Sequence, residues 1–287
     1  MTPAPPILSL RISAGYRGRA DVLCGLELDV QPGEILGLVG QSGSGKSTLA
    51  LAVLRLLEWK GGHARGSIRF QQRELMACSE REMRRIRGRD IGLVLQSPQS
   101  SMNPMLSIGT KLREAWRAHS PGDWRRETPR IRQFLESLGI PGDESFLRRL
   151  PRQISIGQAQ RVLIAMAVIH QPSLLIADEP TSALDAVTQS DTLKLLAHLN
   201  REHRMAVLYI SHDLLAVASF CHRAAILHAG RVVEIGNPRD VFREPRHHYT
   251  RQLIVALPGS LWQSELDRVA GQLEVLEDGV EIGRGRS

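Results

Sequence analysis

Short apolar runs alternate along this chain with longer stretches of helical periodicity. Four runs are suited to buried strands, at residues 34–39, 91–95, 174–178 and 206–210. The stretch 46–57 is rich in Leu and Ala and contains neither Gly nor Pro, and residues 186–199 also follow a helical pattern. Because strands that alternate with helices form largely parallel sheets, the sequence predicts an α/β fold.

Further strands are predicted toward both ends of the chain. Residues 7–12 alternate roughly between apolar and polar side chains, and residues 22–30 follow as a second strand. Residues 61–66 contain three glycines, which predict a loop before a short strand at 67–70. Near the other end, residues 224–235 predict a hairpin with Ala229 and Gly230 at its turn.

The middle of the chain has a different character. From about residue 97 to 152 strand-like runs are missing, and Arg and Glu alternate with apolar residues at helical spacing, as in residues 131–138. Residues 153–170 predict a loop that enters another helix. Just before this region, Ser79 and Glu82 have the spacing of a capping box, which predicts a helix that ends near Gly88. The sequence therefore predicts a helical insert within the α/β chain.

A glycine-rich loop follows the first of the buried strands. The residues from Gly40 to Thr48 contain the pattern G-x-x-x-x-G-K-[ST] between a strand and a helix. Glycine allows backbone conformations closed to other residues, so that amide N–H groups can approach a polyphosphate. The start of the helix adds unpaired N–H donors and the positive end of its dipole. We expect Lys46 to reach the outer phosphates and the Ser47 hydroxyl to ligate Mg²⁺.

Two carboxylates, Asp178 and Glu179, come at the end of another apolar run. The carboxyl ends of parallel strands form the ligand-binding edge of such sheets. There Asp178 would hold Mg²⁺ through water, and Glu179 would orient or deprotonate an attacking water. His212 follows a further apolar run and is a candidate contact for a terminal phosphate. The alternatives are a plain charged turn for the carboxylates and a helix cap at Ser211.

Composition narrows the choice of partners and compartment only a little. The 287 residues suffice for one large domain or two small ones with an ample core. The chain has no apolar run of about 18 residues or more, and the first six residues lack the layout of a secretion signal. Cys24, Cys78 and Cys221 lie far apart, which argues against a disulfide framework and a clustered metal site and suits a reducing compartment. A net charge of +7 suits nucleic acid, anionic lipid headgroups or no specific partner.

The order of these motifs resembles that of ATP-binding cassette (ABC) ATPases. The resemblance rests on the loop at Gly40, on residues 154–158, on the two carboxylates and on His212, and it covers about residues 7–258. It implies a single nucleotide-binding domain over residues 1–258, with a RecA-like P-loop core, an antiparallel β subdomain and an inserted α-helical subdomain at about 97–160. In this family two such domains pair head to tail around two ATP molecules. Each ATP then lies between the phosphate loop of one subunit and the signature motif of the other.

The resemblance also implies roles for particular residues. Tyr16 resembles the aromatic residue that stacks on adenine, and Gln96 resembles the glutamine that ligates Mg²⁺ and couples the site to the transmembrane partner. The implied ATP contacts are Gly40, Ser42, Gly43, Ser44, Gly45, Lys46, Ser47 and Thr48. The implied catalytic residues are Glu179 and His212, and the Mg²⁺ contacts are Ser47, Gln96 and Asp178. The signature residues, which act in trans, are Ser155, Ile156, Gly157 and Gln158. The D-loop, which links the two sites across the interface, is Ser182, Ala183, Leu184 and Asp185.

A closer resemblance is to the peptide and nickel importer subfamily. Residues 96–104 resemble its extended glutamine loop, residues 82–88 the preceding helix, and residues 244–250 its C-terminal H-P-Y-T segment, with His248 where proline is usual. This implies an ATPase at the cytoplasmic face of the inner or plasma membrane. Its implied partners are a second ATPase subunit, two transmembrane permease subunits and an extracytoplasmic solute-binding protein. The transported solute, whether peptide, nickel or another chelated solute, stays open.

The chain departs from the family at the signature, which usually reads L-S-G-G. Here Ile156 stands in place of the first glycine. Glycine lets backbone N–H groups approach phosphate, whereas a β-branched residue restricts the backbone and adds bulk. Because the signature acts in trans, we expect Ile156 to impair the ATP site of the partner. This favours a heterodimer with one weakened site.

The C-terminal part departs from the subfamily as well. Longer members carry a cysteine cluster there, but no cysteine follows Cys221, so the sequence predicts no iron–sulfur cluster. Residues 259–287 form a tail of unknown role that the resemblance does not cover. Its helical apolar spacing indicates a packing helix rather than a regulatory module. The spaced residues are Leu261, Leu266, Val269 and Leu273.

Three alternatives to an importer subunit remain at this point. A nucleic-acid-associated ATPase of the same superfamily would carry long coiled-coil insertions, but residues 48–153 lack sustained heptads, so we expect no nucleic-acid partner. A cassette subunit of a phosphonate-degrading complex would resemble this subfamily in sequence. A small-molecule kinase on a phosphate-loop fold would leave residues 155–161 unexplained.

Overall fold

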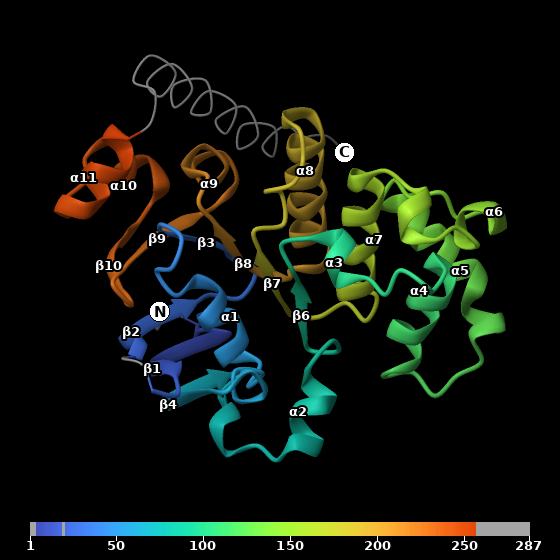
Figure 1. The fold of residues 1–287 in the computed structure, drawn as a ribbon, viewed down its shortest axis with the longest axis horizontal. Helices are drawn as coiled ribbons and strands as arrows, with labels where there is room; N and C mark the ends of the chain where they lie inside the picture. The colour runs from blue at the N-terminus through green and yellow to red at the C-terminus, as the bar shows by residue number, and fades with distance from the viewer. Residues whose placement is uncertain (1–3, 19–20, 257–287) are drawn as a thin grey trace, which may run out of the picture.

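A parallel sheet forms the centre of the molecule (Figure 1). The structure, a computed structural model, describes residues 4–18 and 21–256. The strand order of this sheet is β10-β9-β3-β8-β7-β6. Its strands are β3 (Ile35–Val39), β6 (Ile91–Val94), β7 (Leu174–Asp178), β8 (Ala206–Ser211), β9 (Arg223–His228) and β10 (Arg231–Gly236). All neighbours pair in parallel except β9 and β10, which form the predicted hairpin.

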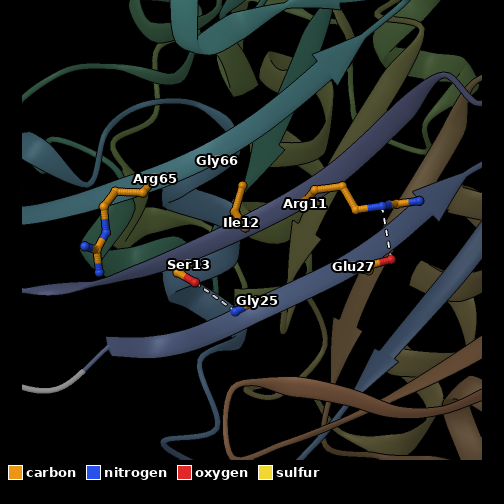
Figure 2. A pocket seen from close by; sticks show the side chains of 7 residues that line it. All are labelled: Arg11, Ile12, Ser13, Gly25, Glu27, Arg65 and Gly66. Carbon is orange, nitrogen blue, oxygen red and sulfur yellow. Dashed lines mark hydrogen bonds and ion pairs between the residues drawn. The ribbon is translucent and has the colours of Figure 1, made fainter.

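A second, antiparallel sheet has the order β2-β1-β4-β5. Its strands are β1 (Leu8–Tyr16), β2 (Asp21–Val30), β4 (Gly62–Phe70) and β5 (Arg73–Glu74). The predicted loop at residues 61–66 is wrong for most of its length, because β4 pairs with β1 from Gly62 opposite Tyr16 to Phe70 opposite Leu8. Gly66 fits this strand only as glycine, since it has a φ of 113° and an added Cβ would lie 2.1 Å from the Arg11 carbonyl oxygen. Figure 2 shows the exposed face of this sheet.

Helices cover the parallel sheet and form the predicted insert. The helices outside the insert are α1 (Lys46–Val53), α2 (Glu80–Ile86), α8 (Ala186–His203), α9 (Leu214–Phe220), α10 (Pro238–Arg243) and α11 (His248–Val255). The insert contains α3 (Pro98–Ser101), α4 (Ile108–Arg117), α5 (Trp124–Ser137), α6 (Glu144–Leu147) and α7 (Ile156–Val168). The capping box of Ser79 and Glu82 begins α2 as predicted. The first helix ends at Val53, short of the predicted residue 57, and Arg55 adopts a φ of 51°.

The core consists of two clusters on opposite faces of the parallel sheet. Leu36 and Leu38 of β3 point into the cluster that also contains α1 and the antiparallel sheet. Ile35 and Val39 point into the other cluster, with α7, α8, α9 and the insert. Side chains of successive strand residues point to opposite faces, so each buried strand contributes to both clusters. This arrangement confirms the predicted α/β core with an antiparallel β part and a helical insert.

None of the described helices combines the length and apolar character that a membrane crossing requires. The predictions for residues 259–287 lie outside the described part of the chain, so the packing helix and the boundary at residue 258 stay predictions.

Candidate active site

The phosphate-binding loop connects β3 to α1 at the carboxyl end of the parallel sheet. Two positions of this loop have room only for glycine, because neighbouring atoms lie too close for a Cβ atom. A Cβ at Gly40 would lie 2.5 Å from the Leu227 carbonyl oxygen, and a Cβ at Gly45 would lie 2.6 Å from a Leu23 methyl group. Gly45 also has a φ of 108°, whereas Gly43, at 83°, has nothing within 4 Å of an added Cβ. The loop is therefore packed against the protein at its ends and open at Gly43.

Lys46 lies within this loop with its side chain turned back onto it. The ammonium group donates hydrogen bonds to the carbonyl oxygens of Gly40 (2.6 Å) and Gln41 (3.0 Å). Burial lowers the pKa of Lys46, and the charges of Glu179 and Asp178 act against this shift. The loop carbonyls thus hold a cation at the place where the sequence predicted contact with the outer phosphates.

Two buried oxygen atoms in this region have no hydrogen-bond partner among the described residues. They are Ser44 Oγ and Asp178 Oδ1. Burial raises the pKa of Asp178, while a hydrogen bond with Ser47 lowers it, the charge of Glu179 raises it and that of Lys46 lowers it. Buried polar atoms in folded proteins nearly always have partners, and oxygen atoms are the ligands that Mg²⁺ prefers. The unpaired atoms therefore fit a phosphate at Ser44 and Mg²⁺ held by Ser47 and Asp178.

Glu179 lies directly after β7 and is held by two other predicted residues. Gln96 Nε2 donates to Glu179 Oε2 at 2.8 Å, and His212 Nδ1 lies 3.2 Å from Glu179 Oε1. Glu179 has a φ of 48°, a left-handed backbone conformation that is uncommon for residues other than glycine. The structure thus brings together residues that follow β6, β7 and β8. Gln96 contacts the carboxylate of Glu179, and its contact with Mg²⁺ stays a prediction.

The predicted signature residues form the start of α7. Ser155 Oγ accepts a hydrogen bond from the Gln158 N–H, and Gln158 Oε1 accepts one from the Ser155 N–H, both at 3.1 Å. The Ile156 side chain is exposed, and an added Cβ at Gly157 would lie 2.6 Å from Cγ2 of Thr188 in α8. In Figure 1 the helix α7 is drawn on the other side of β6 from α1, the helix that follows the phosphate loop.

The predicted D-loop, residues 182–185, connects the active-site carboxylate to α8. The backbone N–H and the hydroxyl of Ser182 donate to the Glu179 carbonyl oxygen at 3.3 and 3.1 Å. Asp185 caps α8 by accepting hydrogen bonds from the N–H groups of Val187 and Thr188. Bonds from Thr188 to this carboxylate lower the pKa of Asp185. The orientation of the loop is therefore tied to both Glu179 and the first turn of α8.

Tyr16 is the last residue of β1 and is partly buried against the cluster around the antiparallel sheet. Its position at a strand end agrees with either of two roles, a structural tyrosine or an adenine contact. Stacking on adenine therefore stays a prediction.

Tyr249 supports the phosphate loop, and the sequence did not predict this role. Its hydroxyl accepts a hydrogen bond from the Gln41 N–H at 3.2 Å, across 208 positions of the sequence. Its ring stacks on His228 with a centroid separation of 3.7 Å. The segment 244–250 was identified only by its resemblance to a subfamily motif. No pattern in the sequence connects it with the loop, because the contact depends on how α11 packs.

The chain is similar in sequence to known proteins. A family model described as ABC transporter matches residues 23–182. The dipeptide transport ATP-binding protein DppD of Escherichia coli is 40% identical over 233 residues, which are 81% of this chain and 71% of the relative. The oligopeptide transport ATP-binding protein OppD of Bacillus subtilis is 37% identical over 259 residues, which are 89% of this chain and 72% of the relative.

Solved structures agree with these relatives. The dimeric ATP-binding cassette MJ0796, in a post-hydrolysis state bound to ADP and Pi, gives a TM-score of 0.70 at 28% identity and covers 80% of this chain and 98% of its own. The cbiO1 protein of Clostridium perfringens, part of the cbiONQ ABC transporter complex, gives a TM-score of 0.72 at 27% identity and covers 91% of this chain and all of its own. The family match spans the phosphate loop and the two carboxylates predicted for the site, Asp178 and Glu179. The chain belongs to the ABC transporter family and is an ATPase of the ATP-binding cassette type.

Proposed function

We propose that this chain is the ATP-hydrolysing subunit of a peptide importer. Relatives named for dipeptide and oligopeptide transport match 81% and 89% of the chain, which supports peptides as the solute. The observation that carries the proposal is the carboxylate of Glu179, held by Gln96 and His212 directly after Asp178. The same relatives favour transport over a phosphonate-degrading complex or a nucleic-acid-associated ATPase. They give no support for nickel.

ATP hydrolysis by this site is mainly a matter of positioning and charge. The loop N–H groups and Lys46 would bind the outer phosphates, and Ser47 and Asp178 would hold Mg²⁺. When bound, this ion neutralises charge on the phosphates. Glu179 would orient the attacking water or accept its proton. His212 would keep the carboxylate in place and reach toward the γ-phosphate, and Tyr16 would stack on the adenine.

A second ATPase subunit would complete the site. Ser155 and Gly157 would contact the ATP bound to the partner subunit. Ile156, which is 43% exposed at the start of α7, would face that ATP, and its bulk would hinder the approach of backbone N–H groups. Val187, at the neighbouring start of α8, is 73% exposed and adds apolar surface suited to coverage by a partner. A heterodimer whose opposite ATP site is weakened agrees best with these features.

Permease subunits and an extracytoplasmic binding protein would complete the importer, with this chain peripheral at the cytoplasmic face of the membrane. Two apolar side chains flank the segment that starts at Gln96. Leu95 is 41% exposed and Met105 is 81% exposed. Contact with a permease near this segment would connect transport to Glu179 through the hydrogen bond of Gln96.

Substitution of the catalytic carboxylate tests the proposal. In the complete importer, Glu179→Gln should lower the rate of ATP hydrolysis by about 10²- to 10⁴-fold and keep ATP affinity, because it removes proton acceptance and leaves the phosphate loop intact. Uptake of a labelled dipeptide into vesicles should fall with the ATPase rate. Retention of full turnover would contradict the role of Glu179. ATP-dependent uptake of nickel without uptake of peptide would contradict the proposed solute.

A further inference from the structure

A basic hollow lies at the seam between the α/β core and the helical insert. It has a volume of about 350 Å³ and opens between the end of α2, the turn before β6 and the end of α4. The lining residues are Arg85, Arg89, Arg117, Ala118, His119, Ser120 and Pro121. Three of them are arginines, one is a histidine and none is acidic.

The charges of this hollow are poorly compensated. Within the described part of the chain, Arg85 and Arg117 form neither an ion pair nor a side-chain hydrogen bond, and Arg89 lies 3.9 Å from the adjacent Asp90. The ring of His119 packs edge-on against His170 at a centroid separation of 5.2 Å. The pKa of His119 is lowered by burial and by the charges of His170 and Arg89, while a hydrogen bond with the Arg87 backbone and the charge of Asp90 act against this shift. Arg85 and Arg117 are therefore the two cations of this hollow without an ion-pair partner among the described residues, whereas Arg89 has a long contact with Asp90.

Arginines that line a hollow of this protein do not generally lack ion-pair partners, as the hollow in Figure 2 shows. That hollow has a similar volume of about 370 Å³ and is lined by Arg11 and Arg65 on the antiparallel sheet. Arg11 pairs with Glu27 at 3.2 Å and with Asp29 at 3.0 Å, and Arg65 pairs with Asp21 at 2.7 Å. Its arginines are paired within the protein, whereas Arg85 and Arg117 of the basic hollow have no ion-pair partner among the described residues.

The basic hollow is separate from the ATP site. Arg89 precedes β6 and His170 precedes β7, whereas Gln96 follows β6 and Glu179 follows β7. The basic hollow therefore lies at the amino-terminal ends of the parallel strands, and the ATP site lies at their carboxyl-terminal ends. A strand of four residues such as β6 spans roughly 13 Å at about 3.3 Å per residue. Since α2 belongs to the core and α4 to the insert, an anion bound between Arg85 and Arg117 would bridge the two parts.

We propose that this hollow binds a phosphate-type oxyanion through Arg85 and Arg117. Planar guanidinium groups match phosphate oxygens in a bidentate manner, and hydrogen bonds between ionised groups are stronger than neutral ones. The anion is either free inorganic phosphate or the headgroup phosphate of an anionic phospholipid. The first source is independent of the proposed function, and the second rests on the proposed location at a membrane.

Free phosphate is tested with the full chain in Mg²⁺ and a saturating non-hydrolysable ATP analogue, so that the phosphate loop is filled. Inorganic phosphate is titrated against chloride at constant ionic strength, with binding followed by calorimetry. The double variant Arg85→Ala/Arg117→Ala should weaken binding about tenfold, the scale of one charge-assisted hydrogen bond. The control Arg65→Ala/Arg69→Ala removes the same charge from exposed arginines elsewhere and should keep the affinity. The double variant Arg85→Lys/Arg117→Lys should recover part of the phosphate affinity that the alanine variant loses.

The lipid source is tested by sedimentation with vesicles of phosphatidylglycerol and phosphatidylcholine, against vesicles of phosphatidylcholine alone. Binding to the anionic vesicles that depends on Arg85 and Arg117 assigns the headgroup, and dependence only in the phosphate titration assigns the free anion. An equal loss in the Arg65/Arg69 control, or no effect of the Arg85/Arg117 variant in either assay, overturns the proposal. Circular dichroism and ATP turnover of each variant show that it is folded. If the unmodified protein showed no ATP turnover, the proposed function would be wrong, but the binding of the anion to Arg85 and Arg117 would still stand.

Discussion

Asp178 and Glu179 occupy positions that favour chemistry over stability. Oδ1 of Asp178 is buried without a partner among the described residues, and burial raises the pKa of this carboxyl group. Glu179 has a φ of 48°, a conformation that costs on the order of 1–3 kcal/mol for a residue other than glycine. Active sites commonly retain such groups because binding or catalysis requires them. Removing one of them should therefore stabilise the fold while it harms the activity.

Asp178→Asn should raise the melting temperature of the protein measured without nucleotide. A carboxyl group whose folded pKa is raised contributes stability that is present below its unfolded pKa and is lost as the pH rises through the folded pKa. The advantage of the variant should therefore be small at low pH and grow as the pH rises to neutrality. Mg²⁺ with an ATP analogue should stabilise the parent protein more than the variant. Thermal denaturation across this pH range, with and without the ligand, checks both expectations.

The residues of the site divide into those with a local signal and those without one. Lys46 lies in a pattern of fixed spacing, and Glu179 and His212 follow apolar runs, so the sequence predicted all three from neighbours in the chain. The hydrogen bond of Tyr249 to the loop and the contact of Gly157 with α8 join distant segments. Such contacts depend on packing angles that a single sequence does not encode in any short pattern.

At the scale of elements, the start of α7 combines two roles that its sequence does not separate. A resemblance assigned both Ile156 and Gly157 to contact with the partner's ATP. The structure shows that Gly157 is also required where α7 packs against α8, since an added Cβ would lie 2.6 Å from Thr188 Cγ2. Ile156 has no such constraint, because its side chain is exposed. Substitution of Gly157 therefore tests the packing of α7 against α8, and substitution of Ile156 tests the predicted contact with the ATP of the partner.

Gly157→Ala should destabilise the protein by about 1–3 kcal/mol through overpacking between α7 and α8. Thr188→Ser removes the methyl group and keeps the hydroxyl, which donates to Asp185 at 2.7 Å. In the double variant most of the loss should therefore be recovered. Chemical denaturation of the parent, the two single variants and the double variant measures this coupling. Additive effects would show that the contact does not limit stability.

Errors in the predicted elements have the same kind of cause. Residues 61–66 looked like a loop because of their glycines, but pairing with β1 extends the strand through them. The helix from Lys46 was predicted to reach residue 57 on composition alone, yet it ends at Val53. Propensity is a weak guide where a neighbouring strand or a packed turn decides the backbone conformation.

At the scale of the whole molecule, the order of strands assembles the site. The sequence predicted that strand ends would carry the catalytic groups, but it gave no order for the strands. The observed order β3-β8-β7-β6 puts the loop with Lys46, then His212, then Glu179, then Gln96 next to one another. The predicted signature at the start of α7 lies outside this row, and we propose that it acts on the ATP of a partner subunit. Assembly with another subunit is therefore where the departure at Ile156 should have its effect.

Ile156→Gly should raise the ATPase rate of the assembled importer, because glycine would let the signature N–H groups approach the ATP of the partner. The rate of the site built on Lys46 should stay unchanged, which a partner subunit with an inactivated phosphate loop would show. Val187→Ala serves as a control, since it trims exposed apolar surface at the start of α8 without altering the signature. No gain in rate for Ile156→Gly would count against an impaired partner site.

The bond between Tyr249 and the Gln41 amide also bears on how the protein is made. During translation the phosphate loop emerges well before its support, because Tyr249, which accepts the hydrogen bond from the Gln41 N–H, follows 208 positions later. A nascent chain can form the β3–α1 turn on the ribosome, whereas this support must wait until α11 has been synthesised and has left the exit tunnel. The nucleotide pocket therefore reaches its final form only after α11 has emerged, and encounters with ATP before that point involve a loop that lacks this anchor.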